Sequence, residues 1–221
     1  MNIVEIRNLK IYFGTGCRLV KALDGIDLEI EKGRFTAIIG ASGSGKTTLL
    51  NAIGGLYRPT AGTVIVDGTD LSDLSEDQMT IFRRRRIGFV FQGYNLVPEL
   101  TIQENIVFPL ALDNSRPDEA FLAEIISLLG LKKKLNCFPH MLSGGGQQCT
   151  AIARALVVKP SIILADEPTG SFDAKTSQNV AGLLKLTAET FHQTLLMITH
   201  NLELAQLADR VVRLQDGRIV S

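Results

Sequence analysis

The chain has 221 residues, 45% of them hydrophobic, and its formal net charge is zero. This length fits one domain, residues 1–221, with a substantial buried core, and the composition excludes a disordered chain. The zero net charge gives no overall electrostatic reason to bind nucleic acid, so we expect no nucleic-acid partner.

The sequence predicts neither a transmembrane segment nor a disulfide framework. A membrane span takes ~20 apolar residues, and the apolar runs at 155–158 and 195–198 are far shorter. Cys17, Cys137 and Cys149 are an odd count without metal-ligand spacing, which favours a reducing cytosol. We expect a soluble protein whose link to a membrane comes through a partner.

Strand signals dominate the first 92 residues. Apolar and polar residues alternate at 3–9 and 22–30, as in half-buried strands. A shorter apolar strand at 34–39 leads into a glycine-rich loop and a helix from about 46 to 53. Further strands are predicted at 62–66 and 87–91. This part of the chain predicts an antiparallel sheet beside a parallel one.

Helical patterns follow Gln92 and then give way to strand–helix alternation. Helices are predicted at 101–108 and 118–129, and Ser143 is a suitable N-cap for a third helix that runs to about 158. We therefore expect a helical insert at 93–159. The remaining predicted elements are strands at 161–165 and 194–199, helices at 174–190 and 202–208, and a hairpin of 210–214 and 218–220 turned by Asp216-Gly217.

A phosphate-binding loop is the first motif that carries chemistry. Residues 40–47 fit the pattern G-x-x-x-x-G-K-[ST], with an apolar strand before them and a helix after them. Backbone N–H groups of such a loop surround a phosphate, Lys46 reaches the β- and γ-phosphates, and the Thr47 hydroxyl ligates Mg²⁺. A chance glycine-rich turn is the alternative, and the full match in the right context argues against it. The predicted nucleotide-binding residues of the loop are Gly40, Ala41, Ser42, Gly43, Ser44, Gly45, Lys46, Thr47 and Thr48.

Two carboxylates follow the apolar strand that ends near residue 165. Asp166 is placed to reach the Mg²⁺ shell, and Glu167 to polarise an attacking water. The alternative is a pair of surface carboxylates at a strand end. Their occurrence together with the phosphate loop favours the catalytic interpretation.

The chain resembles the ATP-binding subunits of ABC transporters over nearly its whole length. The phosphate loop, Gln92, the Leu142-Ser143-Gly144-Gly145 signature, Asp166-Glu167, Asp173 and His200 occur in the family order. The resemblance implies ATP and Mg²⁺ as cofactors. It also implies an α/β fold: a RecA-like P-loop NTPase core at 1–92 and 160–221 that includes an antiparallel β subdomain, with an inserted α-helical signature subdomain at 93–159.

The resemblance also implies roles for single residues. Tyr12 would stack on adenine, although Phe13 could take that place and a core aromatic is the alternative. Gln92 would contact Mg²⁺ and the attacking water, or serve only as a polar strand end. His200 would hold the γ-phosphate and Glu167 in register, whereas His140 and His192 have no such support and are expected at the surface.

A dimer closed on ATP is a further implication. Ser143 and Gly145 would touch the γ-phosphate of ATP held by the opposite subunit, and Asp173 would act across the interface. The dimer would be a homodimer or a pair with another ABC subunit. Catalysis within it would rest on Glu167, His200, Gln92 and Lys46, with Thr47, Gln92 and Asp166 at the metal.

The segment at 89–101 resembles the branch that serves lipoprotein release, macrolide efflux and bacitracin-type resistance. The implied partner is an integral membrane permease of the FtsX-like kind. The protein would lie in the cytoplasm, at the cytoplasmic face of the membrane. The run of arginines at 83–86 is expected to form a solvated face, with phospholipid or nucleic-acid binding as the weaker alternative.

Three positions depart from the usual family pattern. Gly146 stands where the family usually has Gln, Cys149 where it has Arg, and Phe172 where it more often has Leu. A glutamine in place of Gly146 could complete a capping box with Ser143, whereas glycine cannot and costs ~1 kcal/mol in a helix. We expect a frayed signature helix and weak dimerisation or hydrolysis. Cys149 is expected to be sequence drift, with a redox-sensitive thiol as the alternative.

Two other functions compete with a transport ATPase. A non-transport ABC ATPase acting on DNA or ribosomes would carry a coiled-coil insertion or a second ATP domain, and this chain has neither. A regulatory ATP-binding module with weak hydrolysis is opposed by Glu167 and His200, and Gly146 and Cys149 leave it open. A small-molecule P-loop kinase would have no use for the signature.

Overall fold

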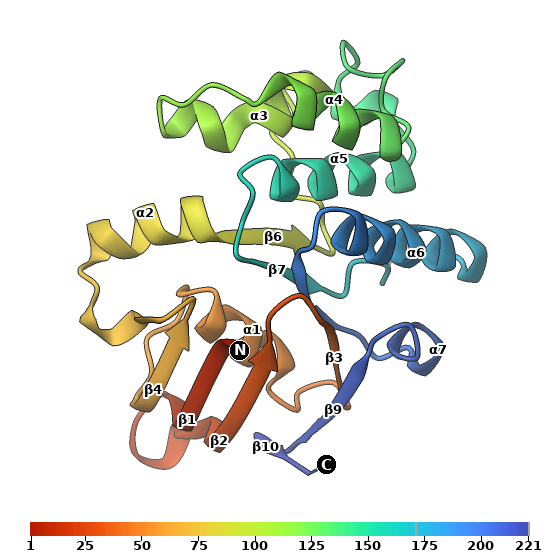
Figure 1. Cartoon of the computed structure of the whole chain (residues 1–221). Coiled ribbons are helices and arrows are strands. Elements are labelled where there is room, and N and C mark those ends of the chain that lie inside the picture. The colour runs from red at the N-terminus through yellow and green to blue at the C-terminus, as the bar shows by residue number, and fades with distance from the viewer. Residues whose placement is uncertain (171, 221) are drawn as a thin grey trace.

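The structure, a computed structural model, describes residues 1–170 and 172–220, apart from the side chain of Cys17. Its strands form a six-stranded sheet of order β10-β9-β3-β8-β7-β6 and a four-stranded sheet of order β2-β1-β4-β5 (Figure 1). The predicted pair of an antiparallel sheet beside a largely parallel one is confirmed.

The smaller sheet is antiparallel throughout. It contains β1 (Asn2–Phe13), β2 (Val20–Glu31), β4 (Ala61–Val66) and β5 (Thr69–Asp70). β1 lies between β2 and β4 and pairs with both. β1 and β2 are longer than the predicted strands because backbone pairing continues past the point where the apolar alternation stops.

The larger sheet places the ends of its parallel strands at one edge. It contains β3 (Phe35–Ile39), β6 (Ile87–Phe91), β7 (Ile162–Asp166), β8 (Thr194–Ile198), β9 (Arg210–Gln215) and β10 (Arg218–Ile219). All its pairings are parallel except that of β9 with β10. Open parallel sheets bind ligands beyond the carboxyl ends of their strands, and the predicted site residues follow β3, β6, β7 and β8.

Helices cover both faces of this sheet. They are α1 (Lys46–Ile53), α2 (Glu76–Arg86), α3 (Ile102–Leu112), α4 (Glu119–Leu128), α5 (Gly144–Leu156), α6 (Ala174–Thr190) and α7 (Leu202–Ala205), with short 3-10 turns at Gly16–Arg18, Leu71–Asp73 and Pro139–Met141. Figure 1 shows α3, α4 and α5 gathered on the side of the sheet that lies away from the antiparallel strands. Among the residues that the structure covers, no helix is both long and apolar enough to cross a membrane.

Two apolar cores result from the alternation of side chains along the central strands. Leu164 and Leu196 pack with α1 and the antiparallel sheet in the first core. Ile163 and Leu195 point to the opposite face and pack with α3, α4, α5 and α6 in the second core. The strands β7 and β8 are almost wholly buried, as expected for a parallel sheet covered on both faces.

The sequence interpretation missed α2, although its N-terminus has a clear signal. Ser75 and Gln78 form a capping box, in which each side chain bonds the other residue's backbone N–H. The arginine run forms the last turn of this helix. Arg84 and Arg85 both pair with Asp113 at the end of α3. The expected solvated face was therefore only partly right, because these arginines fasten α2 to α3.

Candidate active site

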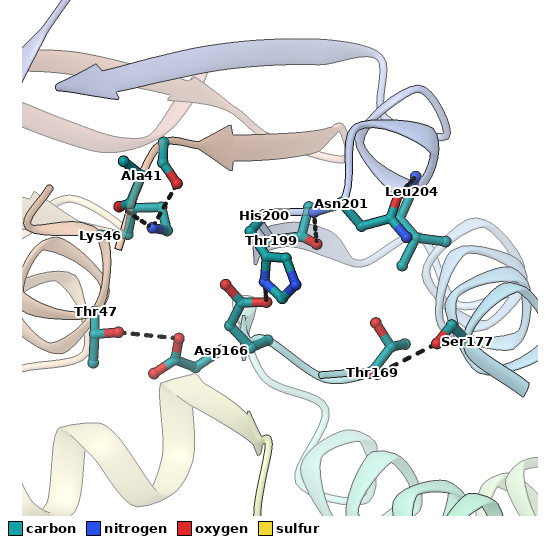
Figure 2. Close-up of polar contacts among 12 residues, drawn as sticks. Ala41, Lys46, Thr47, Asp166, Thr169, Ser177, Thr199, His200, Asn201 and Leu204 are labelled. Carbon is teal, nitrogen blue, oxygen red and sulfur yellow. Dashed lines mark hydrogen bonds and ion pairs between the residues drawn. The ribbon is translucent and has the colours of Figure 1, made fainter. Parts of the chain in front are cut away.

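The phosphate loop joins β3 to α1. Gly43 and Gly45 have φ values of 79° and 102°, which favour glycine and turn the loop tightly. The Lys46 ammonium donates to the carbonyl oxygens of Gly40 at 2.9 Å and Ala41 at 2.8 Å. Figure 2 shows Lys46 folded back toward Ala41. These bonds hold the positive charge over the loop that precedes the N-terminus of α1, an arrangement suited to a phosphate chain.

A hydroxyl and a carboxylate meet beside this loop. The Thr47 hydroxyl donates to Asp166 at 3.3 Å, as Figure 2 shows. Burial raises the pKa of Asp166 above its ordinary value, while the bond from Thr47 and the charge of Lys46 oppose that shift. Hydroxyl and carboxylate oxygens are the donors that Mg²⁺ prefers. The two side chains fit the predicted metal site.

The chain turns away from β7 at Glu167, immediately after Asp166. Its φ is 46° and its backbone N–H donates to the Ile198 carbonyl at 3.0 Å. Its carboxylate lies 2.7 Å from Nδ1 of His200, which follows β8. Two strand ends thus bring a carboxylate and an imidazole together at the sheet edge. Such a pair suits a base and the group that orients it.

A cavity of about 850 Å³ contains most of the predicted phosphate-side residues. Those that line it are Ser42, Gly43, Gly45, Lys46, Thr47, Thr48, Gln92, Glu167 and His200. Its wall also includes five residues that the sequence interpretation missed: Val20, Lys21, Ala22, Asp216 and Gly217. The local pattern of Asp216-Gly217 indicates only a hairpin turn, so no sequence signal assigns it to this cavity.

Tyr12 does not line this cavity. It lies on β1, half-buried, and pairs with Lys21 on β2. Its hydroxyl donates to Asp24, and the Lys21 ammonium lies 5.4 Å from the centre of its ring. Adenine stacking on Tyr12 stays a prediction, and Lys21 is the neighbour that connects Tyr12 with the cavity wall.

The signature residues also lie away from this cavity. Ser143 caps α5 by accepting from the Gly146 N–H at 3.3 Å. Gly144 packs against the stacked rings of Tyr94 and Phe172, which leave no room for a Cβ. Asp173 caps α6. Ser143, Gly145 and Asp173 therefore are not brought to the phosphate loop of their own chain.

The N-terminus of α5 lacks the reciprocal capping box that α2 and α3 have, as do the N-termini of α4 and α6. The helices α2 and α3 both begin with a reciprocal capping box, whereas Ser143 accepts one bond and Gly146 returns none. Gln147 compensates in part, since its side-chain amide donates to the Leu142 carbonyl at 3.2 Å. The helix still begins at Gly144. The reciprocal bond is missing because glycine has no side chain, and the start of α5 shows no fraying; weak dimerisation or hydrolysis stays a prediction.

The family follows from comparison with known proteins. The profile of the family described as ABC transporter matches residues 23–170, which is more than half of the chain. The chain belongs to this family. This match confirms the resemblance inferred from the motifs. ABC proteins in general bind adenine nucleotides and hydrolyse ATP.

Individual ABC relatives support the predicted branch. The chain is 43% identical to the lipoprotein-releasing system ATP-binding protein LolD of Syntrophotalea carbinolica, over 98% of this chain and 96% of that protein. It is 43% identical to the macrolide export ATP-binding/permease protein MacB of Mannheimia succiniciproducens, over 100% of this chain and 34% of that protein. The chain thus spans about a third of the length of this MacB.

A solved ABC structure confirms the fold class. The chain matches the dimeric post-hydrolysis structure of the ATP-binding cassette MJ0796 bound to ADP and Pi with a TM-score of 0.88 and 39% identity. The match covers 99% of this chain and 97% of that one. The predicted P-loop NTPase core with an antiparallel β subdomain and a helical subdomain is therefore correct.

The cysteines of this ABC protein give no sign of a redox site in the described residues. Cys149 is 8% exposed, packs in the second core, and has a pKa raised by burial. A reactive cysteine needs an accessible thiolate, so the structure opposes the redox alternative. Cys137 is half-buried, and the side chain of Cys17 lies outside the described part of the chain.

Proposed function

We propose that this chain is the ATP-binding and ATP-hydrolysing subunit that powers an FtsX-like membrane permease. The permease would export or extract a lipid, a lipoprotein, or a peptide or other antibiotic. The observation that carries the proposal is the 2.7 Å contact between Glu167 and His200 in the cavity that also contains Lys46. A carboxylate oriented by an imidazole beside a phosphate loop is the equipment of a hydrolase.

The chain's own groups divide the work of phosphoryl transfer. Lys46 and the loop N–H groups bind the phosphates and offset charge that builds up in the transition state. Thr47 and Asp166 would hold Mg²⁺, which when bound neutralises phosphate charge. Glu167 orients the attacking water, with His200 keeping its carboxylate in place. Gln92, which follows β6 and lines the same cavity, would complete the shell around the metal and that water.

Two copies would complete each site. Ser143, Gly145 and Asp173 lie outside their own chain's cavity, and the N-terminal end of α5 offers backbone N–H groups to an anion. The matched cassette is dimeric and bound to ADP and Pi. These observations support a sandwich in which each signature faces the partner's phosphate loop, in a homodimer or with a second ABC subunit.

A separate groove suits the permease. It has a volume of about 410 Å³, lies between α2, β6, α3 and α5, and has mainly apolar walls. Phe91, which lines this groove, directly precedes Gln92, which lines the ATP cavity; Asn95, three residues further on, also lines the groove. The relative MacB is named as an ATP-binding/permease protein and extends far beyond the part that this chain matches. We therefore place a cytoplasmic segment of the permease in this groove.

Mg²⁺-dependent phosphate release tests the enzymatic part of the proposal. Glu167→Gln and His200→Ala should each reduce kcat by at least about 100-fold, the usual contribution of general base catalysis. His192→Ala is the matched control, because His192 is exposed outside the cavity and should retain full activity. Full activity in Glu167→Gln would contradict the assignment.

Capture of the permease tests the transport part. Leu112 lines the groove and is 53% exposed, so Leu112→Glu should fold and yet prevent capture and permease-stimulated hydrolysis. Leu186 is 43% exposed on α6 and lies outside the groove, so Leu186→Glu is the control. Capture of ribosomes or DNA in place of a permease would favour a non-transport ABC ATPase.

A further inference from the structure

Asp24 is the centre of a polar cluster at the edge of the antiparallel sheet. Its carboxylate accepts a hydrogen bond from the Tyr12 hydroxyl and another from Arg218 of β10 at 3.0 Å. The Lys21 ammonium lies 3.9 Å from the same carboxylate. The Asp24 side chain is 19% exposed. The bonds from Tyr12 and Arg218 hold the pKa of Asp24 below its ordinary value, so it stays ionised near neutral pH.

The backbone of Asp24 leads from this cluster to the phosphate loop. Its N–H donates to the Gly217 carbonyl at 3.0 Å, and the Gly217 N–H donates to the Ser44 carbonyl at 3.0 Å. Gly217 has a φ of 72°, and a Cβ there would lie 2.8 Å from the Ala22 carbonyl oxygen. The hairpin turn is therefore pressed between β2 and the phosphate loop, in the wall of the ATP cavity.

We infer that Asp24 is a positioning residue for the nucleotide base, and that it joins the Tyr12 ring to the phosphate loop through the C-terminal hairpin. Its carboxylate fixes the Tyr12 hydroxyl at one end of the ring and restrains Lys21 over the ring face. Arg218 anchors the carboxylate from β10. This inference rests on the proposed function, specifically on Tyr12 as the surface on which the base stacks.

A merely structural role predicts a different result from a positioning role. Loss of a sheet-edge contact would loosen the whole cavity, so affinity for the phosphate part and for the complete nucleotide would fall together. Loss of base positioning lowers affinity only for ligands that carry the base. The ratio of the two affinities separates these roles, and neither measurement requires hydrolysis.

Calorimetric titration with MgADP and with magnesium pyrophosphate tests the inference. Asp24→Ala and Tyr12→Phe should each weaken ADP binding by about threefold to tenfold, the range for one net hydrogen bond, and leave pyrophosphate binding unchanged. The double variant should be no weaker than the more affected single one, because both remove the same bond. Arg213, exposed on the neighbouring β9, makes no described side-chain bond, so Arg213→Met should change neither affinity.

Gly217→Ala tests the connection to the phosphate loop. It should weaken ADP and pyrophosphate alike, because it displaces the turn that supports Ser44. Unchanged ADP affinity in Asp24→Ala, or an equal loss for both ligands in that variant, would overturn the inference. Unchanged ADP affinity in Tyr12→Ala would show that the base does not use Tyr12. A chain that binds ADP with the expected pattern but never hydrolyses ATP would contradict only the proposed function.

Discussion

Replacing Gly146 with glutamine should strengthen the ATP-dependent dimer. The new side-chain amide could return the missing bond to the Ser143 N–H and complete the capping box that α2 and α3 already have. The gain has two parts: ~1 kcal/mol for replacing glycine inside a helix, and ~0.5 kcal/mol for the new hydrogen bond.

Crowding at Leu142 opposes this gain. A Cβ at position 146 would lie 3.3 Å from Cβ and Cδ2 of Leu142, so that side chain must move by a few tenths of an ångström. At the lower end of overpacking costs this takes ~1 kcal/mol. The net gain is then ~0.5 kcal/mol for each α5. It acts on the dimer only where the start of α5 is frayed in the monomer and ordered in the dimer; two signatures then give ~1 kcal/mol, about fivefold in the dissociation constant.

The assay is sedimentation with saturating ATP, with Glu167→Gln as the background so that ATP persists. Gly182→Gln is the matched control, because Gly182 lies exposed on α6 with open space around it. It should raise thermal stability without affecting the dimer. An unchanged dimer constant in Gly146→Gln, or an equal change in both variants, would refute the reasoning. Cys149→Arg is not combined with Gly146→Gln, because position 149 is buried and an arginine there would bury an unpaired charge.

Three further predictions concern the core, the thiol and the metal. Ile152 is fully buried, so Ile152→Ala should lower the free energy of unfolding by about 2–5 kcal/mol in urea, and a loss below about 0.5 kcal/mol would contradict this packing. Because burial raises the pKa of Cys149, less thiolate forms at about pH 8 than in an ordinary cysteine, and mass spectrometry should find Cys149 alkylated only after unfolding; rapid labelling of folded protein would refute this. EDTA should abolish ATP hydrolysis and Mg²⁺ should restore it, and Thr47→Ala should require more Mg²⁺; metal-independent hydrolysis would contradict the assigned site.

Local motifs were enough to predict which residues meet beside the phosphate loop. The phosphate loop follows β3, Asp166 is the last residue of β7 and Glu167 comes directly after it. Parallel strands end at one sheet edge, so the meeting of these residues follows from the order of elements. The placement of His200 against Glu167 needed the family resemblance, because 33 residues separate them.

The polar cluster around Asp24 could not be predicted in this way. The bond between Arg218 and Asp24 joins residues 194 positions apart, and neither residue belongs to a motif. The helix α2 was missed for another reason. Its last turn consists of four arginines, which we interpreted only as a charged run, although the capping box at Ser75 indicates a helix start. Strand ends were short in the prediction because backbone pairing extends β1 and β2 beyond their apolar pattern.

The ATP-dependent association of the Glu167→Gln variant tests the central claim most directly. Light scattering after size-exclusion chromatography should show a dimer with ATP and a monomer without it. Adding Ser143→Arg to the same chain should abolish that dimer while each monomer still binds ATP, because Ser143 would act only on the partner's nucleotide. A Glu167→Gln protein that stays monomeric with bound ATP would contradict the account, as would a dimer that Ser143→Arg leaves intact.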